Sequence, residues 1–165
     1  MGLIHWRVVE YNETMSDQRR FAWLRITFGA IWAVDAYFKW QPAFFANFTS
    51  YLSGSIGDQP YLVKQWINLW IHVVGINPNL FALFVALIET AIALALILGI
   101  FPKLTVSAGV AMGIIIWSTA EGFGGPYTAG STDIGAAIIY VLVFLALYFG
   151  HAWDDLRIIG AKKPQ

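Results

Sequence analysis

Four stretches of the chain are apolar and long enough to cross a membrane as helices. They run from Phe21 to Trp40, from Leu80 to Ile100, from Lys103 to about Ala120, and from Ile134 to about Gly150. A helix of about 20 mostly apolar residues, rising ~1.5 Å per residue, spans the ~30 Å hydrocarbon core of a bilayer. The pattern therefore predicts an all-α integral membrane protein: a single domain, residues 1–165, built as a four-transmembrane-helix bundle.

The connection between the first two spans, residues 41–79, is too long for a simple turn and contains two amphipathic pieces. The first is the aromatic-rich run PAFFANFTSYL at 42–52, which ends in SGSIG. The second runs from Pro60 to Val74, and its polar residues at four-residue spacing are Lys64, Asn68 and His72. It is too short to span, and amphipathic helices rich in Trp favour the membrane interface. We expect both pieces to be interfacial helices at one surface of the bilayer.

Basic residues are concentrated on one side of the predicted topology. Four spans place both termini on the same side, where seven basic residues fall: Arg7, Arg19, Arg20, Lys103, Arg157, Lys162 and Lys163. The opposite side has only Lys64. Because basic loops stay in the cytoplasm, we expect a multi-pass protein of the cell membrane with cytoplasmic termini. The segment 41–79 and the glycine-rich loop after the third span then face outward, and residues 1–20 form a polar lead-in to the first span.

The composition agrees with a membrane location and narrows the chemistry. The chain is 58% hydrophobic and 12% charged, with a mean hydropathy of +0.62, whereas soluble domains are about 25% charged. The net charge is zero, which does not indicate the excess of basic residues that is typical of nucleic-acid-binding proteins. The absence of cysteine excludes thiolate metal sites and c-type haem attachment in this chain. The three histidines, His5, His72 and His151, lie outside the spans, so we expect neither metal nor haem here.

The first span contains three charged residues, which is unusual for a membrane helix. A charge at the bilayer centre costs at least ~2.5–3.5 kcal/mol, so such side chains face protein or water. Asp35 precedes Lys39 by four residues, the favourable order for an ion pair on one helix. That pair is either a local intrahelical contact or part of a site. Arg25, seven residues before Trp32 on the same face, either extends to the headgroups or pairs with Glu89 of the second span.

Carboxylates and aromatic residues converge toward the outward side of the predicted bundle. Glu89 lies near mid-membrane, and we expect it to act in a polar network or a proton path. Glu121 and Asp133 flank the glycine-rich loop. Aromatic walls with a few polar groups are typical of a small-molecule pocket, and a quinone head group needs such partners. The candidate catalytic residues are Asp35, Glu89 and Glu121; the candidate substrate- or quinone-binding residues are Arg25, Trp32, Lys39, Trp117, Tyr127 and Asp133.

Structural roles for some of these residues stay open at this point. Asp133 within Ser131-Thr132-Asp133 is a plausible N-cap for the fourth span, and a simple interfacial cap is at least as likely for Asp133 as a role in a site. The pattern Gly109-x-x-x-Gly113 in the third span permits close approach of a neighbouring helix.

Three motifs give the chain a resemblance to the DoxD/DoxX family of small four-span membrane proteins. They are LRITFG with the downstream Lys39, Glu89 followed by LILGIFPKLT, and the run WSTAEGFGGPYTAGSTDIGAAIIY, which resembles the DoxD type. DoxD-like proteins are similar to the membrane subunit of a thiosulfate:quinone oxidoreductase, which oxidises thiosulfate to tetrathionate and passes the electrons to membrane quinone.

The resemblance implies a subunit of a hetero-oligomeric membrane complex. Its partner would be a DoxA-like subunit or a terminal oxidase, quinone would be its substrate, and it would hold no metal or flavin of its own. The alternative is a non-catalytic accessory or structural subunit of a larger respiratory or membrane-enzyme complex, because small spans without cofactor ligands fit that role as well. A small transporter has less support, since the spans show no inverted repeat or broken helix.

Overall fold

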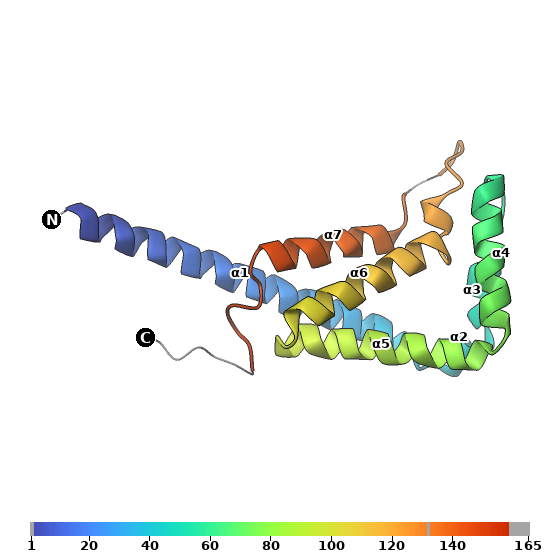
Figure 1. Cartoon of the computed structure of the whole chain (residues 1–165), viewed down its shortest axis with the longest axis horizontal. Coiled ribbons are helices and arrows are strands. Elements are labelled where there is room, and N and C mark those ends of the chain that lie inside the picture. Colours follow the sequence, from blue (N-terminus) through green and yellow to red (C-terminus); the bar gives the residue numbers. More distant parts are fainter. Residues whose placement is uncertain (1, 132, 159–165) are drawn as a thin grey trace.

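The computed structural model of the chain describes residues 2–131 and 133–158, with side chains from residue 17 onward. Within that part every regular element is a helix (Figure 1). In chain order they are α1 Gly2–Lys39, α2 Pro42–Ala46, α3 Phe48–Ser53, α4 Tyr61–Gly75, α5 Pro78–Leu98, α6 Pro102–Ser118, the 3₁₀ turn η1 Gly122–Gly124, and α7 Ala136–Phe149.

Four helices, α1, α5, α6 and α7, form a bundle of two pairs. α1 packs along α5 and α6 packs along α7, whereas α5 with α6 and α1 with α7 share much less contact. Figure 1 shows α6 diverging from α5 as both approach α4. The pairs are therefore joined at the end where α5 leads into α6, called here the inner end, and separated at the end near α4, the outer end.

Within each helix pair, a glycine lets the two helices approach closely. A Cβ on Gly29 of α1 would lie 2.9 Å from the Leu96 Cβ of α5, so only glycine permits this approach. A Cβ on Gly109 of α6 would overlap the Phe144 ring of α7. The predicted close approach at Gly109 is thus confirmed, and it is made within the chain, between α6 and α7.

The local sequence explains where α5 begins and ends. Asn77 Oδ1 accepts the Leu80 N–H at 3.1 Å, and Pro78 occupies the first turn, where no N–H is needed. Gly99 ends the helix with φ +70°, the left-handed conformation that glycine adopts without strain. The predicted second span, Leu80 to Ile100, is confirmed as a helix with its bounds shifted by two residues.

The first span and the polar lead-in are one continuous helix. The sequence predicts a separate lead-in at 1–20, but α1 runs unbroken from Gly2 to Lys39 and extends beyond the bundle at the inner end (Figure 1). No Gly or Pro interrupts residues 3–28, so nothing in the sequence stops the helix from extending. The side chain of Arg7, and Lys162 and Lys163, lie outside the described residues.

The predicted amphipathic pieces are confirmed as helices at the outer end. The first is split at Asn47 into α2 and α3, and the second is α4, which runs across the direction of the bundle in Figure 1. Phe44, Phe48 and Leu52 pack with Val74 and Ala82 in a small apolar core. The three helices together cover the outer end of the bundle.

One helix of the described chain, α5, is long and apolar enough to cross a membrane, and α6 and α7 are shorter apolar helices. α7 has 14 residues, and at ~1.5 Å each these span about 21 Å of a ~30 Å core. It begins later than the predicted Ile134 because Gly135, with φ +89°, is not helical.

Candidate functional site

A cavity of about 600 Å³ lies between the two helix pairs at the outer end. Its walls come from all four bundle helices, and α2, α3 and α4 also line it. Most of the lining is apolar and aromatic, including Trp32, Phe44, Phe48, Trp70 and Tyr140. The volume falls in the range of about 300–1,000 Å³ that is usual for small-molecule sites.

At the inner side of the cavity a cluster of four aromatic rings joins α1 to α7, and two of these rings, Trp32 and Tyr140, line the cavity. Trp32 lies edge-on to Tyr140 and Phe144, with ring centroids 5.5 Å and 5.1 Å apart. Phe28 contacts the same two rings at 5.8 Å and 5.1 Å. Edge-to-face packing of this kind is favourable beyond the area it buries. Trp32 is thus placed at the cavity as predicted, fixed in position by its neighbours.

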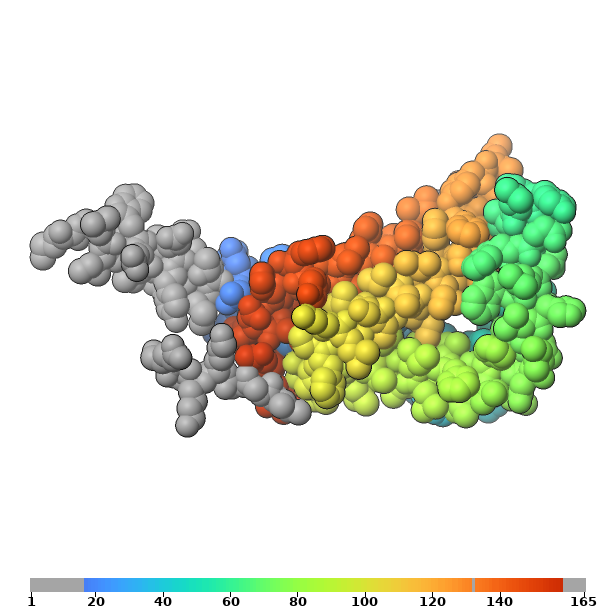
Figure 2. Space-filling model, viewed as in Figure 1, coloured from blue at the N-terminus to red at the C-terminus, as the bar shows by residue number. Residues whose placement is uncertain are grey.

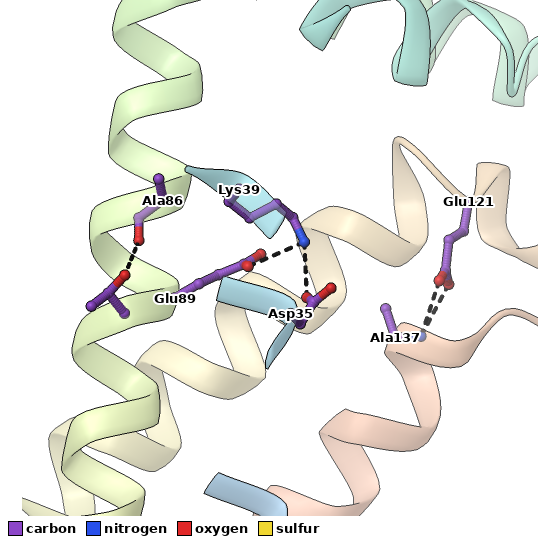
Figure 3. A network of polar contacts seen from close by, with 7 residues as sticks. Asp35, Lys39, Ala86, Glu89, Glu121 and Ala137 are labelled. Atoms are coloured by element: carbon purple, nitrogen blue, oxygen red, sulfur yellow. Dashed lines mark hydrogen bonds and ion pairs between the residues drawn. The ribbon is translucent and has the colours of Figure 1, made fainter. Parts of the chain in front are cut away.

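Three charged side chains from α1 and α5 meet at the cavity wall (Figure 3). Lys39 Nζ donates to Asp35 Oδ2 at 2.8 Å and lies 3.2 Å from Glu89 Oε2. Exposure falls along the group: the side chain is 46% exposed in Asp35, 18% in Lys39 and 0% in Glu89. The predicted pair Asp35–Lys39 is confirmed, and the structure adds Glu89 as its third member.

Glu89 is the least satisfied member of this group. Lys39 is within ion-pair distance of one oxygen but not in hydrogen-bond geometry, and Glu89 Oε1 has no hydrogen-bond partner among the described residues. A buried carboxyl group with free acceptor capacity can take up a proton or bind a polar group of a ligand. The group therefore provides both a cation and a proton acceptor at an otherwise apolar wall.

Arg25 lies away from the cavity, at the inner end. Its buried guanidinium donates to backbone carbonyls: Leu96 at the end of α5 and, in the tail after α7, Ala152 at 2.9 Å and Leu156 at 2.7 Å. Both alternatives considered for this residue, headgroup contact and pairing with Glu89, are wrong. Arg25 does not line the cavity either. The cause is the ending of α5, whose last carbonyls have no partner within the helix.

Glu121 lines the cavity, but its oxygens are already occupied. They accept the backbone N–H of Ala136 at 3.2 Å and of Ala137 at 3.1 Å, and so cap the start of α7 (Figure 3). Gly135 makes this possible, because a Cβ there would overlap the Glu121 carboxylate. The cap predicted from Asp133 is wrong in detail: among the described residues, Asp133 accepts the Gly135 N–H, at 2.8 Å, and no N–H of α7.

The other two predicted aromatic residues are Trp117, near the end of α6, and Tyr127, in the loop that follows α6. Trp117 Nε1 donates to Ile134 O at 2.8 Å and its ring packs on Phe123. The Tyr127 hydroxyl donates to Phe123 O at 2.5 Å, and the side chain is exposed. Neither Trp117, Tyr127 nor Asp133 lines the cavity. They shape the glycine-rich loop and do not contact the ion group.

Hydrogen bonds from the segment between α3 and α4 close the outer end. Ser55 Oγ donates to Thr119 O at 2.7 Å, and Gln59 Nε2 donates to Gly122 O at 3.1 Å. Sequence reasoning missed these ties and the wall residues of α2 to α4. The many aromatic residues at 42–52 were the signal that could have indicated a cavity wall. Because this segment was interpreted as an interfacial piece, the position of Phe44 and Phe48 at the cavity was not predicted.

The described part of the chain has no group of three or more His, Asp or Glu side chains that could hold a metal ion. Asp35, Lys39 and Glu89 are charged groups that a ligand in the cavity could contact, alongside its aromatic walls. Comparison of the chain with models of protein families, with curated proteins and with solved structures gives no match.

Proposed function

We propose that α1, α5, α6 and α7 cross the cell membrane, with the inner end in the cytoplasm and α2 to α4 at the outer surface. The perpendicular course of α4 supports this, since an amphipathic helix lying across a bundle is suited to the interface (Figure 1). The basic residues Arg19, Lys103 and Arg157 at the inner end, against Lys64 at the outer end, support the orientation.

In this arrangement the cavity is the binding site of a membrane quinone. The observation that carries the proposal is the ion group Asp35–Lys39–Glu89 at the wall of an apolar, aromatic cavity. Lys39 would donate a hydrogen bond to one quinone oxygen, and the buried carboxyl group of Glu89 would pass a proton to the reduced head group. Asp35, half-exposed, would restore that proton through Lys39.

The reaction proposed for the assembled complex is that of a DoxD-like subunit of a thiosulfate:quinone oxidoreductase. Two thiosulfate ions join through a new S–S bond to give tetrathionate and release two electrons. Quinone takes those electrons with two protons and becomes quinol. This chain would bind the quinone and supply its protons.

The thiosulfate site is assigned to a partner subunit. The glycine-rich loop forms a second, more polar hollow lined by residues such as Gly125, Thr128 and Asp133. The residues lining it include no basic side chain, and the Asp133 carboxylate would repel a divalent anion. A DoxA-like subunit covering the outer end would therefore have to provide the cationic groups that hold thiosulfate.

The test is thiosulfate-dependent reduction of a quinone analogue by the purified complex. Glu89→Gln keeps the shape of the side chain but removes its proton transfer, and we expect the rate to fall by about 10²-fold or more. The control is Asp58→Asn, an exposed carboxylate away from the cavity, which should keep the wild-type rate. A fully assembled wild-type complex without this activity would contradict the proposal and favour the accessory-subunit alternative.

A further inference from the structure

The cavity has an opening between α5 and α6. These helices diverge toward the outer end, and the space-filling view is hollowed between them beside α4 (Figures 1 and 2). Phe84 and Ile88 of α5 and Ile115 of α6 line the cavity and are also exposed at the surface. The residues that line both the cavity and this opening are thus large and apolar.

Two other directions out of the cavity are covered. At the outer end, α2 to α4 lie over it and are tied to the segment after α6 by Ser55 and Gln59. At the inner end the ring cluster of Phe28, Trp32, Tyr140 and Phe144 blocks it. In the proposed topology, the opening between α5 and α6 lies below the interfacial α4 and faces hydrocarbon.

We infer that this opening is a lateral portal for the apolar tail of a ligand dissolved in the bilayer. The inference rests on the proposed function and adds the class of substrate: a lipid-soluble molecule with a long hydrocarbon chain, which enters from the membrane and not from water. Its polar head lies near Lys39 and Glu89, and its tail passes between Ile88 and Ile115 into the lipid. An apolar rim matches an apolar tail, because neither side must give up hydrogen bonds to water.

The experiment uses a quinone analogue whose isoprenoid tail carries a photoreactive diazirine, added to the purified full chain in lipid vesicles. Illumination links the tail to nearby residues, which mass spectrometry identifies. We expect labels on Phe84, Ile88 and Ile115 and on Met112, a buried cavity residue. Excess unlabelled tailed quinone should abolish these labels, whereas labels on lipid-facing Ile114 should persist.

Two neighbouring isoleucines provide a matched pair of variants. Ile115 and Ile114 are 42% and 46% exposed, yet only Ile115 lines the cavity. Ile115→Trp should reduce competable labelling of Met112 about tenfold, because the added volume obstructs an occupied passage. Ile114→Trp should leave it unchanged. Equal labelling in the two variants would overturn the portal.

A second pair and a second probe keep the test decisive. If Ile115→Trp does not fold, Ile88→Trp is compared with Leu87→Trp, since Leu87 is exposed beside Ile88 but outside the cavity lining. A phospholipid with the diazirine in its acyl chain is tested in parallel. Competable labelling of Met112 by that lipid as strongly as by the quinone would support the portal and contradict quinone as the head group. Competable quinone labels confined to residues away from α5 and α6 would overturn the portal while leaving quinone binding intact.

Discussion

At the scale of single residues, the stability of the protein depends on Lys39, which lies between an exposed and a buried carboxylate. Replacing it by methionine keeps the volume but leaves Glu89 buried without a counter-charge. Breaking a buried ion pair in this way costs about 3–5 kcal/mol. We expect Lys39→Met to lower the thermal midpoint of the detergent-solubilised protein strongly, as measured by circular dichroism.

The double variant Lys39→Met with Glu89→Gln tests the cause of that loss. Because it removes both charges, we expect it to recover most of the stability lost in Lys39→Met. A double variant no more stable than Lys39→Met would contradict an ion pair between these side chains. The double variant should still fail to reduce quinone in the assembled complex.

The sequence predicted only one of the two contacts that Lys39 makes in this group. Asp35–Lys39 follows from a spacing of four on one helix, which brings the two side chains to the same face whatever the fold. The contact of Lys39 with Glu89 depends on how α1 and α5 are rotated and shifted against each other. Arg25 was equally available to Glu89 in the sequence, and only the depth of the two helices in the bundle decides between them.

At the scale of elements, α7 is held at its start by a side chain from the segment that follows α6. Glu121 accepts two N–H groups of the first turn of α7. Removing such a cap costs about 0.5–2 kcal/mol. We expect Glu121→Ala to lower the thermal midpoint and to increase hydrogen exchange at Ala136 and Ala137.

The matched control for the cap is Glu121→Gln. An amide oxygen still accepts these N–H groups, so Glu121→Gln should retain most of the stability and of the quinone-reducing activity. Loss of activity without loss of stability in this variant would instead assign Glu121 the catalytic role predicted from the sequence.

The contact between α6 and α7 is equally specific. A Cβ at Gly109 would overlap the ring of Phe144, and forcing extra volume into a packed core costs about 1–3 kcal/mol. We expect Gly109→Ala to destabilise the protein and Phe144→Leu to relieve part of that loss when the two are combined. Gly57→Ala is the control, because a Cβ there meets nothing within 4 Å. Independent, additive effects of Gly109→Ala and Phe144→Leu would contradict the contact.

At the scale of the whole molecule, hydropathy predicted the helices well and their arrangement poorly. Apolar length and turn residues located α5 to within two residues and α4 to within one. The same pattern does not show that the four long helices form two pairs that separate at one end, because pairing depends on small residues such as Gly29 meeting a particular partner. The cavity is a product of that separation, so its existence was not readable from any one helix.

The topology proposed for the molecule has a direct test. The chain contains no cysteine, so single cysteines can be introduced without background. Asp58→Cys at the outer end should react in intact cells with a membrane-impermeant maleimide, and Arg19→Cys at the inner end should react only after the cells are opened. The reverse pattern would invert the proposed orientation, and equal reactivity of both sites would contradict a membrane between them.

The position of Arg25 has a consequence for the order in which the protein can be completed. Its guanidinium is made with α1, but two of its carbonyl partners, Ala152 and Leu156, follow it by 127 and 131 residues. Until they are made, α1 carries a cation that lacks those two partners. The packing of α1 can therefore be completed only after the segment that follows α7 is made. In the proposed topology, a ribosome stalled before residue 152 would present the membrane insertion machinery with a first helix that is not yet ready for release into lipid.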